Sequence, residues 1–112
     1  MYSINSASFN PKGDTIASCD SYGNLKLFDV RSLAQLATVD VGPHPANHVT
    51  FDSSSQLVAI SSNDATIKMY EIAAGKVTSL IGHEDAVQTS LFDRAGEFLI
   101  SGGSDYTVRI WS

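Results

Sequence analysis

The sequence predicts an all-β fold built from one structural unit that occurs three times. Apolar and polar residues alternate with a period of two in runs of five to seven residues, which is typical of β-strands with one buried face. Turn-forming residues separate these runs. The whole pattern recurs after 42 and again after 41 residues. No stretch shows a convincing helical period with caps, so no helix is expected to contribute to the core.

The repeat is visible when Phe9, Phe51 and Phe92 are placed in one column. Further columns hold one type of residue in all three copies: apolar residues at Ile16, Val58 and Leu99 and at Leu25, Ile67 and Val108, basic residues at Lys26, Lys68 and Arg109, and aromatic residues at Phe28, Tyr70 and Trp111. Agreement over some twenty consecutive positions in three copies indicates that each copy forms the same supersecondary unit.

Each copy is expected to contain antiparallel strands joined by tight turns. The expected strands are 4–10, 14–19, 24–30 and 34–41 in the first copy, 46–52, 56–61, 66–72 and 76–81 in the second, and 86–92, 97–102 and 107–111 in the third. Residues 31–37 are also compatible with a single helical turn, although the alternation returns at Thr38. The third copy has no counterpart of the fourth strand before Ser112.

Composition and charge exclude several classes of protein. The chain has 112 residues and a net charge of −5, which indicates at most one domain and argues against binding to nucleic acid or to an anionic membrane. No apolar run approaches the ~18 residues of a membrane span, and no signal peptide is visible. Cys19 is the single cysteine, so it cannot form an internal disulfide, and it is interpreted as a small buried hydrophobe.

The third copy resembles a WD repeat. Gly82-His83, with Trp111 twenty-eight residues after the histidine, and the run Leu-Ile-Ser-Gly-Gly-Ser-Asp-x-Thr-Val-Arg-Ile-Trp at 99–111 carry this resemblance. It covers essentially the whole chain, although Phe28-Asp29 and Tyr70-Glu71 replace Trp-Asp in the first two copies. The resemblance implies blades of a β-propeller, here two complete four-stranded blades (1–45 and 46–85) and three strands of a third (86–112).

A chain of this length is expected to be an incomplete propeller on its own, because a closed ring needs about four to eight blades. Open blade faces leave apolar surface uncovered, and an unpaired strand edge invites pairing with another chain. The chain is therefore expected to be the C-terminal segment of a longer protein or a short product that must pair, including by self-association through its open blade edges.

Four polar residues of the third copy suggest either a hydrolase or a structural network. His83, Ser101 and Asp105 are residue types of a catalytic triad. The WD-repeat resemblance instead implies that they form a structural tetrad with Trp111, linked in the order Asp105, His83, Ser101, Trp111. A nucleophile would need a strained, exposed position beside an oxyanion hole, and a strand serine between Ile100 and Gly102 offers none. We therefore expect no catalytic residue.

No metal or cofactor site is expected. His44 and His48 have a spacing that suits zinc on a helix, but prolines bracket His44, His48 begins an extended strand, and further ligands are missing. Gly102-Gly103 lies between two strands, so it cannot act as a phosphate-binding loop ahead of a helix. The basic column is interpreted as a consequence of the repeat, with a ligand site as the weaker alternative.

A protein-binding surface is expected where the loops before the first strand and after the second strand of each copy share one rim. The candidate binding residues on this rim are Asp20, Tyr22, His44, Asp64, Glu84, Asp85 and Tyr106. The rim loops are acidic and contain no Lys or Arg, and tyrosine is enriched at protein interfaces. This rim is therefore expected to meet a basic partner surface.

A narrower resemblance connects residues 41–52, 82–87 and 91–112 with the C-terminal repeats of the sperm-associated antigen 16 family, WD-repeat proteins of the central-pair apparatus of cilia and flagella. It implies a non-catalytic cytoplasmic scaffold of the axoneme, with other central-pair components as partners. A WD-repeat adaptor in signalling or in ubiquitin-ligase recruitment is the first alternative, and an enzyme is the second.

Overall fold

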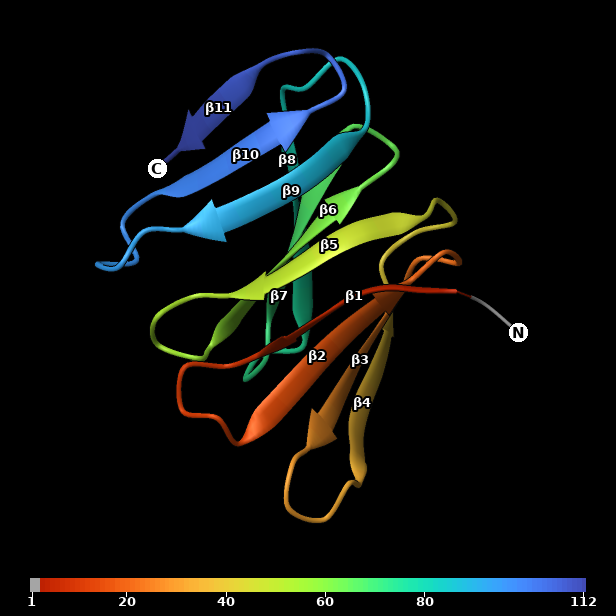
Figure 1. The fold of residues 1–112 in the computed structure, drawn as a ribbon, viewed down its shortest axis with the longest axis vertical. Helices are drawn as coiled ribbons and strands as arrows, with labels where there is room; N and C mark the ends of the chain where they lie inside the picture. Colours follow the sequence, from red (N-terminus) through yellow and green to blue (C-terminus); the bar gives the residue numbers. More distant parts are fainter. Residues whose placement is uncertain (1–2) are drawn as a thin grey trace.

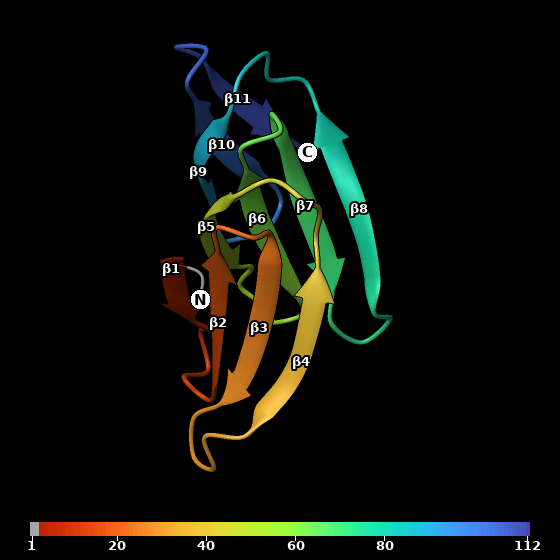
Figure 2. The same cartoon turned by 90° about the vertical axis from the view of Figure 1, so that its right-hand side faces the viewer.

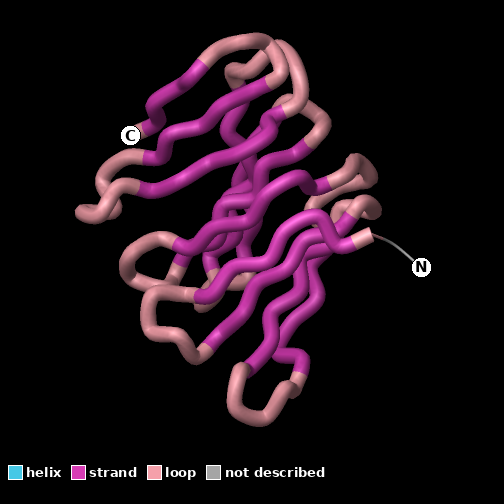
Figure 3. Tube along the Cα trace, in the orientation of Figure 1, coloured by secondary structure: helices cyan, strands magenta, loops and turns pink. Residues whose placement is uncertain are grey.

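A computed structural model describes residues 3–112 of the protein. These residues form eleven strands. Figure 3 shows them joined by loops and turns, with no helix among the described residues. The strands make three antiparallel sheets of four, four and three strands, which confirms the all-β fold expected from the alternating pattern. The described part of the chain contains no helix that is long and apolar enough to span a membrane.

The strands follow the sequence repeat and pair in chain order within each sheet. The first sheet holds β1 (Ile4–Phe9), β2 (Thr15–Asp20), β3 (Asn24–Asp29) and β4 (Gln35–Asp40). The second holds β5 (Ala46–Phe51), β6 (Leu57–Ser62), β7 (Thr66–Glu71) and β8 (Lys76–Ile81), and the third β9 (Val87–Phe92), β10 (Leu99–Gly103) and β11 (Val108–Trp111).

Residues 31–37, which were compatible with a helical turn, instead form a tight turn that continues into β4 at Gln35. The Asp29 carboxylate accepts hydrogen bonds from the Ser32 N–H and hydroxyl, and Leu33 has a φ of 59°. A left-handed residue ends any right-handed helical turn, so the chain reverses here and continues as a strand.

The three sheets succeed one another along the molecule (Figure 1). The first strands of the sheets lie next to one another, with β5 between β1 and β9. In Figure 2, β4 and β8 lie on the side away from β1 and β5. Each sheet therefore turns one face toward the next, and the loops that join its strands gather at two opposite ends.

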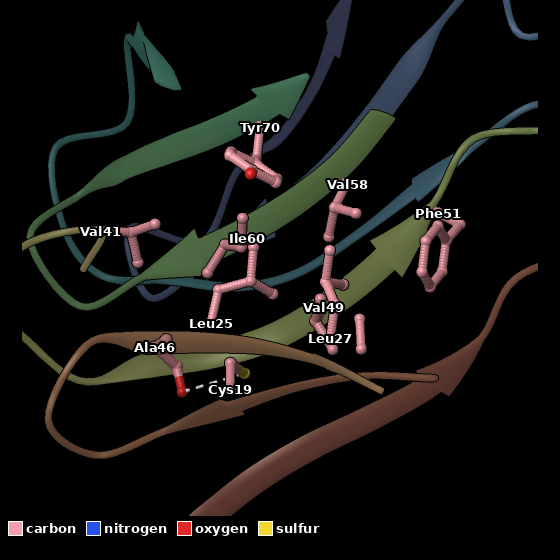
Figure 4. Close-up of a cluster of buried hydrophobic side chains, with 11 residues drawn as sticks. Cys19, Leu25, Leu27, Val41, Ala46, Val49, Phe51, Val58, Ile60 and Tyr70 are labelled. Atoms are coloured by element: carbon pink, nitrogen blue, oxygen red, sulfur yellow. Dashed lines mark hydrogen bonds between the residues drawn. The ribbon is translucent and has the colours of Figure 1, made fainter. Parts of the chain in front are cut away.

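The larger apolar core lies between the first and second sheets (Figure 4). Leu25 and Leu27 of β3 pack from the first sheet, and Val58 and Ile60 of β6 pack from the second. All four side chains are almost entirely buried. The alternation along each strand explains this arrangement, because every second side chain points to the same face.

Cys19 belongs to this core. Its side chain is fully buried, and its thiol approaches the Ala46 carbonyl of the second sheet at 3.5 Å. Burial, and secondarily the charge of Asp20, raise the pKa of the thiol to about 12. A thiol that stays protonated at neutral pH is a poor nucleophile, so Cys19 acts as a small core residue.

A smaller core lies between the second and third sheets. Ala59 and Ile67 face Val87 and Leu99 across this interface, and Phe92, Met69, Leu80 and Trp111 pack around them. In β6, Val58 and Ile60 thus face the first sheet while Ala59 faces the third. The second sheet is consequently covered on both faces.

Each sheet carries a β-bulge in its first strand. The ladder between the first two strands shifts at Asn5 in the first sheet, at Asn47 in the second and at Gln88 in the third. These three residues are equivalent in the repeat, and each has a side-chain amide. A bulge bends the strand and redirects the side chain of its extra residue, so the three amides point in a direction that simple alternation does not give.

Candidate functional site

A chain of four hydrogen-bonded side chains lies in the third sheet and the loop before it. The His83 imidazole sits between two partners: its Nδ1 lies 3.0 Å from Asp105 Oδ2, and its Nε2 lies 2.7 Å from Ser101 Oγ. Trp111 Nε1 donates to the same Ser101 Oγ at 2.9 Å. The four side chains are therefore linked in the order Asp105, His83, Ser101, Trp111.

One assignment of protons satisfies every polar atom in this chain. A carboxylate only accepts, so the His83 Nδ1–H donates to Asp105. The neutral imidazole then accepts at Nε2 from the Ser101 hydroxyl, whose oxygen accepts from the Trp111 N–H. The side chain of His83 is completely buried, and buried polar groups need partners of this kind. The arrangement can thus hold a loop, a turn and two strands together.

Asp105 is the centre of the network. Besides His83 it accepts hydrogen bonds from the Glu84 N–H at 2.9 Å and from the Thr107 hydroxyl at 2.6 Å. The Thr107 hydroxyl, the Glu84 N–H and the imidazole together hold the pKa of the Asp105 carboxyl well below its usual value. The carboxylate is therefore charged at neutral pH and joins the loop before β9 to the turn after β10.

Sequence reasoning missed Thr107 and Gly103. An available signal was the pattern Asp-x-Thr, which the second copy repeats: the Thr66 hydroxyl donates to Asp64 at 2.6 Å. Gly103 provides space, because a Cβ at this position would lie 2.8 Å from His83 Nδ1 and 2.9 Å from Asp105 Oδ1. Only glycine lets the imidazole and the carboxylate approach so closely at this point.

The second sheet has no such histidine network. Its equivalent of Ser101 is Ile60, which is fully buried, and His44 is exposed. Asp64 is held instead by Lys68, whose Nζ lies 3.0 Å from Asp64 Oδ2. Burial alone would raise the pKa of Asp64, but hydrogen bonds from Thr66, Lys68 and Ser62 lower it to about 2. An ammonium thus takes the role that the imidazole has in the third sheet.

The geometry of this network does not suit a serine nucleophile. Ser101 is only 1% exposed, and its hydroxyl oxygen is engaged by both His83 and Trp111. A substrate carbonyl cannot reach a buried hydroxyl, and an attacking serine must be able to approach it. What the four side chains can do chemically is to pair one another's buried polar atoms.

The candidate rim residues differ in how far they are exposed. Tyr106 is 100% exposed and Tyr22 is 57% exposed, and Glu84, Asp85 and His44 are also exposed. Asp20 is only 4% exposed, because its carboxylate accepts hydrogen bonds from the Tyr22 and Asn24 N–H groups and closes its own turn.

The charge available at the rim therefore comes mainly from Glu84 and Asp85. Asp64 and Asp105 are tied to Lys68 and His83 in the turns described above. Tyr106 is in the left-handed region, with a φ of 66°, and the equivalent positions in the other sheets are Gly23 and Ala65. The turn thus presents a complete tyrosine ring to solvent at a position where smaller residues serve elsewhere.

A metal centre is not assembled in the part of the chain that the structure describes. Among residues 3–112, no three His, Cys, Asp or Glu side chains come close enough together to hold an ion. His44 is exposed, whereas His48 lies on β5 with its Nδ1 buried and without a hydrogen-bond partner, and burial lowers its pKa.

Comparison with known families gives matches along the whole chain. The profile described as "WD domain, G-beta repeat" matches residues 2–29, 35–71 and 75–112. Each match begins near the last strand of one sheet or the first strand of the next and ends near the third strand, so the profile counts the same three units with a shifted boundary.

Three curated relatives illustrate the similarity. A guanine nucleotide-binding protein subunit beta-5b from Danio rerio is 33% identical over 110 residues, which is 96% of this chain and 28% of that protein. A nuclear distribution protein nudF from Aspergillus niger is 36% identical over 72% of this chain and 17% of its own length. Striatin-4 from Mus musculus is 33% identical over 80% of this chain and 12% of its own. The chain thus spans well under a third of the length of these relatives.

Proposed function

The chain belongs to the WD40-repeat family, and on that premise we propose that it is a non-catalytic scaffold that binds other proteins. The observation that supports this most is the use of its conspicuous polar residues. His83, Ser101 and Asp105 are saturated by one another and by Trp111, so they stabilise a blade and leave surface loops as the means of recognition. Propellers of this kind present loops at the ends of their strands because neighbouring sheets cover the strand faces.

The binding surface in this proposal is the rim around the third sheet. Glu84 and Asp85 supply exposed negative charge, and the fully exposed ring of Tyr106 lies in the turn held to Glu84 through Asp105. A tyrosine offers a large contact area at a small entropic cost, and carboxylates favour a basic partner. Charges at a rim act mainly on the association rate and on the sensitivity of binding to salt.

A salt titration tests the rim. The protein is used to capture partners from a ciliary extract at increasing salt, and the bound fraction is compared with that of the double variant Glu84→Lys, Asp85→Lys. Binding by the rim should weaken with salt and fall in the variant. The matched control is Glu71→Lys with Glu97→Lys, which should bind as the parent does. Both acids are exposed and lie away from the rim, Glu71 at the end of β7 and Glu97 in the turn between β9 and β10. If the bound fraction changes neither with salt nor with Glu84→Lys, Asp85→Lys, the interface lies elsewhere on the protein.

The finer proposal is a cytoplasmic role in the axoneme of cilia and flagella, with central-pair components as partners. It is supported by the resemblance of residues 41–52, 82–87 and 91–112 to central-pair WD-repeat proteins. The tagged protein, expressed in ciliated cells, should accumulate along the central pair. Diffuse cytosolic signal, with unchanged stability of the protein, would reject this location while leaving the scaffold role intact.

A second candidate is an adaptor in another intracellular complex, such as a signalling assembly or a ubiquitin ligase. The observation that favours it is the 33% identity with a guanine nucleotide-binding protein β subunit over 96% of the chain. The localisation experiment separates the two, because an adaptor of this kind should remain outside the axoneme. An enzyme is the least supported alternative, and it would require an activity that Ser101→Ala removes without unfolding the protein.

A further inference from the structure

A hollow of about 390 Å³ lies between the first and second sheets, at the end of the molecule opposite the acidic rim. The turn between β1 and β2 and the turn between β5 and β6 border it, together with the start of β4. Both sheets that enclose it have four strands, so the hollow belongs to an interface inside the chain and not to an outer face. Its size is in the range of pockets that bind ligands.

The floor of this hollow is apolar. Leu27 and Phe51, drawn in Figure 4, are core residues that also line it. Ala37 of β4 and Ile72 after β7 add to the same lining and are only partly buried. An alanine leaves space that a larger side chain would fill. The floor can therefore receive an apolar side chain from outside.

Tyr70 gives the hollow a polar group without a partner. In the third sheet the equivalent aromatic residue, Trp111, donates its N–H to Ser101. In the second sheet Ile60 replaces that serine and offers no polar atom. Tyr70 is only 7% exposed, lines the hollow, and its hydroxyl makes no hydrogen bond with any residue that the structure describes. A tyrosine hydroxyl in so buried a residue usually has a partner, so this one is available to a ligand.

Ser55 adds a second hydroxyl of this kind. It stands in the turn between β5 and β6, borders the hollow, and its Oγ is buried without a hydrogen-bond partner. The equivalent positions in the other two copies are Gly13 and Gly96, and all three residues have a positive φ. A left-handed conformation costs less for glycine than for serine. The second copy thus keeps a hydroxyl group where the backbone favours none.

Lys12 is the charged group at the mouth that is free to pair with a ligand. The neighbouring carboxylate of Asp14 accepts hydrogen bonds from Asn10 Nδ2 at 2.7 Å and from the Thr15 hydroxyl at 3.1 Å. These bonds lower the pKa of Asp14 and hold its carboxylate within the turn. Lys12 is exposed and has neither a hydrogen bond nor an ion pair among the described residues. An ammonium in this position favours a carboxylate ligand.

From these three features we infer that the hollow binds a short peptide segment of another protein, in which a large apolar residue stands next to an acidic one. The apolar side chain occupies the floor beside Leu27 and Phe51, a peptide carbonyl accepts from the Tyr70 hydroxyl, and the carboxylate pairs with Lys12. This site takes acidic segments, whereas the rim is proposed to take basic ones. It rests on the proposed role in binding other proteins but not on the position of the rim.

Three short fluorescent peptides test the chemistry of the site. They share a glycine-serine background and differ only at two adjacent positions, which are leucine-glutamate, leucine-lysine or serine-glutamate. Fluorescence polarisation measures their binding to the protein. The leucine-glutamate peptide should saturate the protein below about 1 mM, and each of the other two should bind at least about tenfold more weakly.

Tyr70→Phe removes only the hydroxyl group. It should raise the dissociation constant of the leucine-glutamate peptide about tenfold, the effect of losing one hydrogen bond. The urea denaturation curve should stay unchanged, because this hydroxyl has no partner in the protein. The matched control is Tyr106→Phe, at a fully exposed tyrosine on the opposite end, which should alter neither measurement.

Two further variants test the charge and the floor. Lys12→Glu should reverse the preference between the leucine-glutamate and leucine-lysine peptides. Lys76→Glu is its control, since Lys76 is exposed at the same end of the sheets and does not line the hollow. Ala37→Leu should fill the floor and abolish binding of both leucine peptides. If circular dichroism shows that Ala37→Leu does not fold, Tyr70→Phe and Lys12→Glu still decide.

Several results would overturn the inference. These are no saturation by any of the three peptides, equal binding of all three, or a leucine-glutamate affinity that neither Tyr70→Phe nor Lys12→Glu changes. A loss of stability in Tyr70→Phe would show that the hydroxyl serves the fold instead of a ligand. The rim variant Glu84→Lys, Asp85→Lys should bind the peptides as the unchanged protein does, so a failure of the rim proposal can be told apart from a failure of this one.

Discussion

Ser101 joins two buried ring nitrogens through one hydroxyl group. Replacing it by alanine should leave Trp111 Nε1 and His83 Nε2 without partners, and each unpaired buried group destabilises the folded state. We expect Ser101→Ala to lower the free energy of unfolding by about 1–3 kcal/mol, measured by urea denaturation. Ser53→Ala, in an exposed turn, is the control and should lie within about 0.5 kcal/mol of the unchanged protein. An unaltered stability with a lost activity would instead point to catalysis.

The charged state of Asp105 and Asp64 makes the stability depend on pH. Hydrogen bonds keep the pKa of Asp105 low in the folded protein, and the pKa of Asp64 falls to about 2, whereas an unfolded aspartate titrates near about 3.9. The unfolded state therefore binds protons first as the pH falls, and stability that is present above about pH 4 is lost toward about pH 2.

Asp105→Asn tests this dependence. The variant should be less stable than the unchanged protein at neutral pH, and its free energy of unfolding should fall less steeply between about pH 4 and about pH 2. The measurement is a series of urea melts at several pH values. Equal slopes for the two proteins would show that the contribution of Asp105 is the same in the folded and unfolded states.

Cys19 should be inert in the folded protein. Its thiol is fully buried and its pKa is about 12, so almost no thiolate exists at neutral pH. Ellman's reagent should react with it only after unfolding, at a rate that follows the fraction of unfolded protein in urea. A fast reaction without urea would mean that the first and second sheets separate readily.

Among single residues, the sequence predicted those that stand at matching positions of the repeat. The WD-repeat resemblance named the four members of the His83 network, because the spacing of these residues along the sequence is what carries the resemblance. The role of Gly103 could not be predicted, since it depends on a distance of 2.8 Å to a side chain twenty residues away in the sequence. The use of the Asp20 carboxylate by the backbone of its own loop was likewise not predicted, because the sequence does not show which partner a charged loop residue takes.

Among the elements, the turns impose the strictest local demands. Gly13 and Gly23 both have positive φ, at 75° and 82°, but their surroundings differ. A Cβ on Gly13 would meet nothing within 4 Å, whereas a Cβ on Gly23 would lie 1.9 Å from the Gly42 carbonyl oxygen. The loop between β4 and β5 therefore rests directly on the turn after β2.

Alanine substitutions at the two glycines should distinguish the cost of a left-handed backbone from the cost of a steric clash. Gly13→Ala should lose about 1 kcal/mol of stability from its left-handed backbone alone. Gly23→Ala adds the displacement of the loop at Gly42, so we expect a loss of at least about 3 kcal/mol or failure to fold. Thermal and urea denaturation of the two variants measures both losses of stability. Equal losses would show that the loop at Gly42 moves aside without a cost in stability.

The strands themselves were predicted within two residues at each end, because alternation and turn residues mark them directly. The bulges at Asn5, Asn47 and Gln88 were not predicted. A bulge adds one residue to one strand of a pair without a distinctive change in the composition of that strand, so the local sequence pattern does not predict it. The pairing register is what shows that these three equivalent positions are bulges.

For the whole molecule, stability should be unequal among the three sheets. In repeat architectures each unit contacts only its neighbours, and here the second sheet has a neighbour on both faces. Val58, Ala59 and Ile60 of β6 are all fully buried. Hydrogen exchange followed by mass spectrometry should therefore find the slowest amides in β6 and faster exchange in β11. Uniform protection over the three sheets would indicate that the chain unfolds as one unit.

In the first two sheets the bulge amide donates to a backbone carbonyl of the next sheet, from Asn5 to Ala46 and from Asn47 to Val87. This choice of acceptor has a consequence for how such a chain can grow. A backbone carbonyl is supplied by any residue type, so the bond from Asn47 fixes a position without demanding a particular neighbour. A gene that duplicated residues 46–86 in tandem would place Ala46 of the new copy where Val87 now accepts that bond. The apolar layers would still have to fit, but they are built from interchangeable aliphatic residues. Lengthening by duplication would thus preserve the hydrogen bond that joins the second sheet to the next.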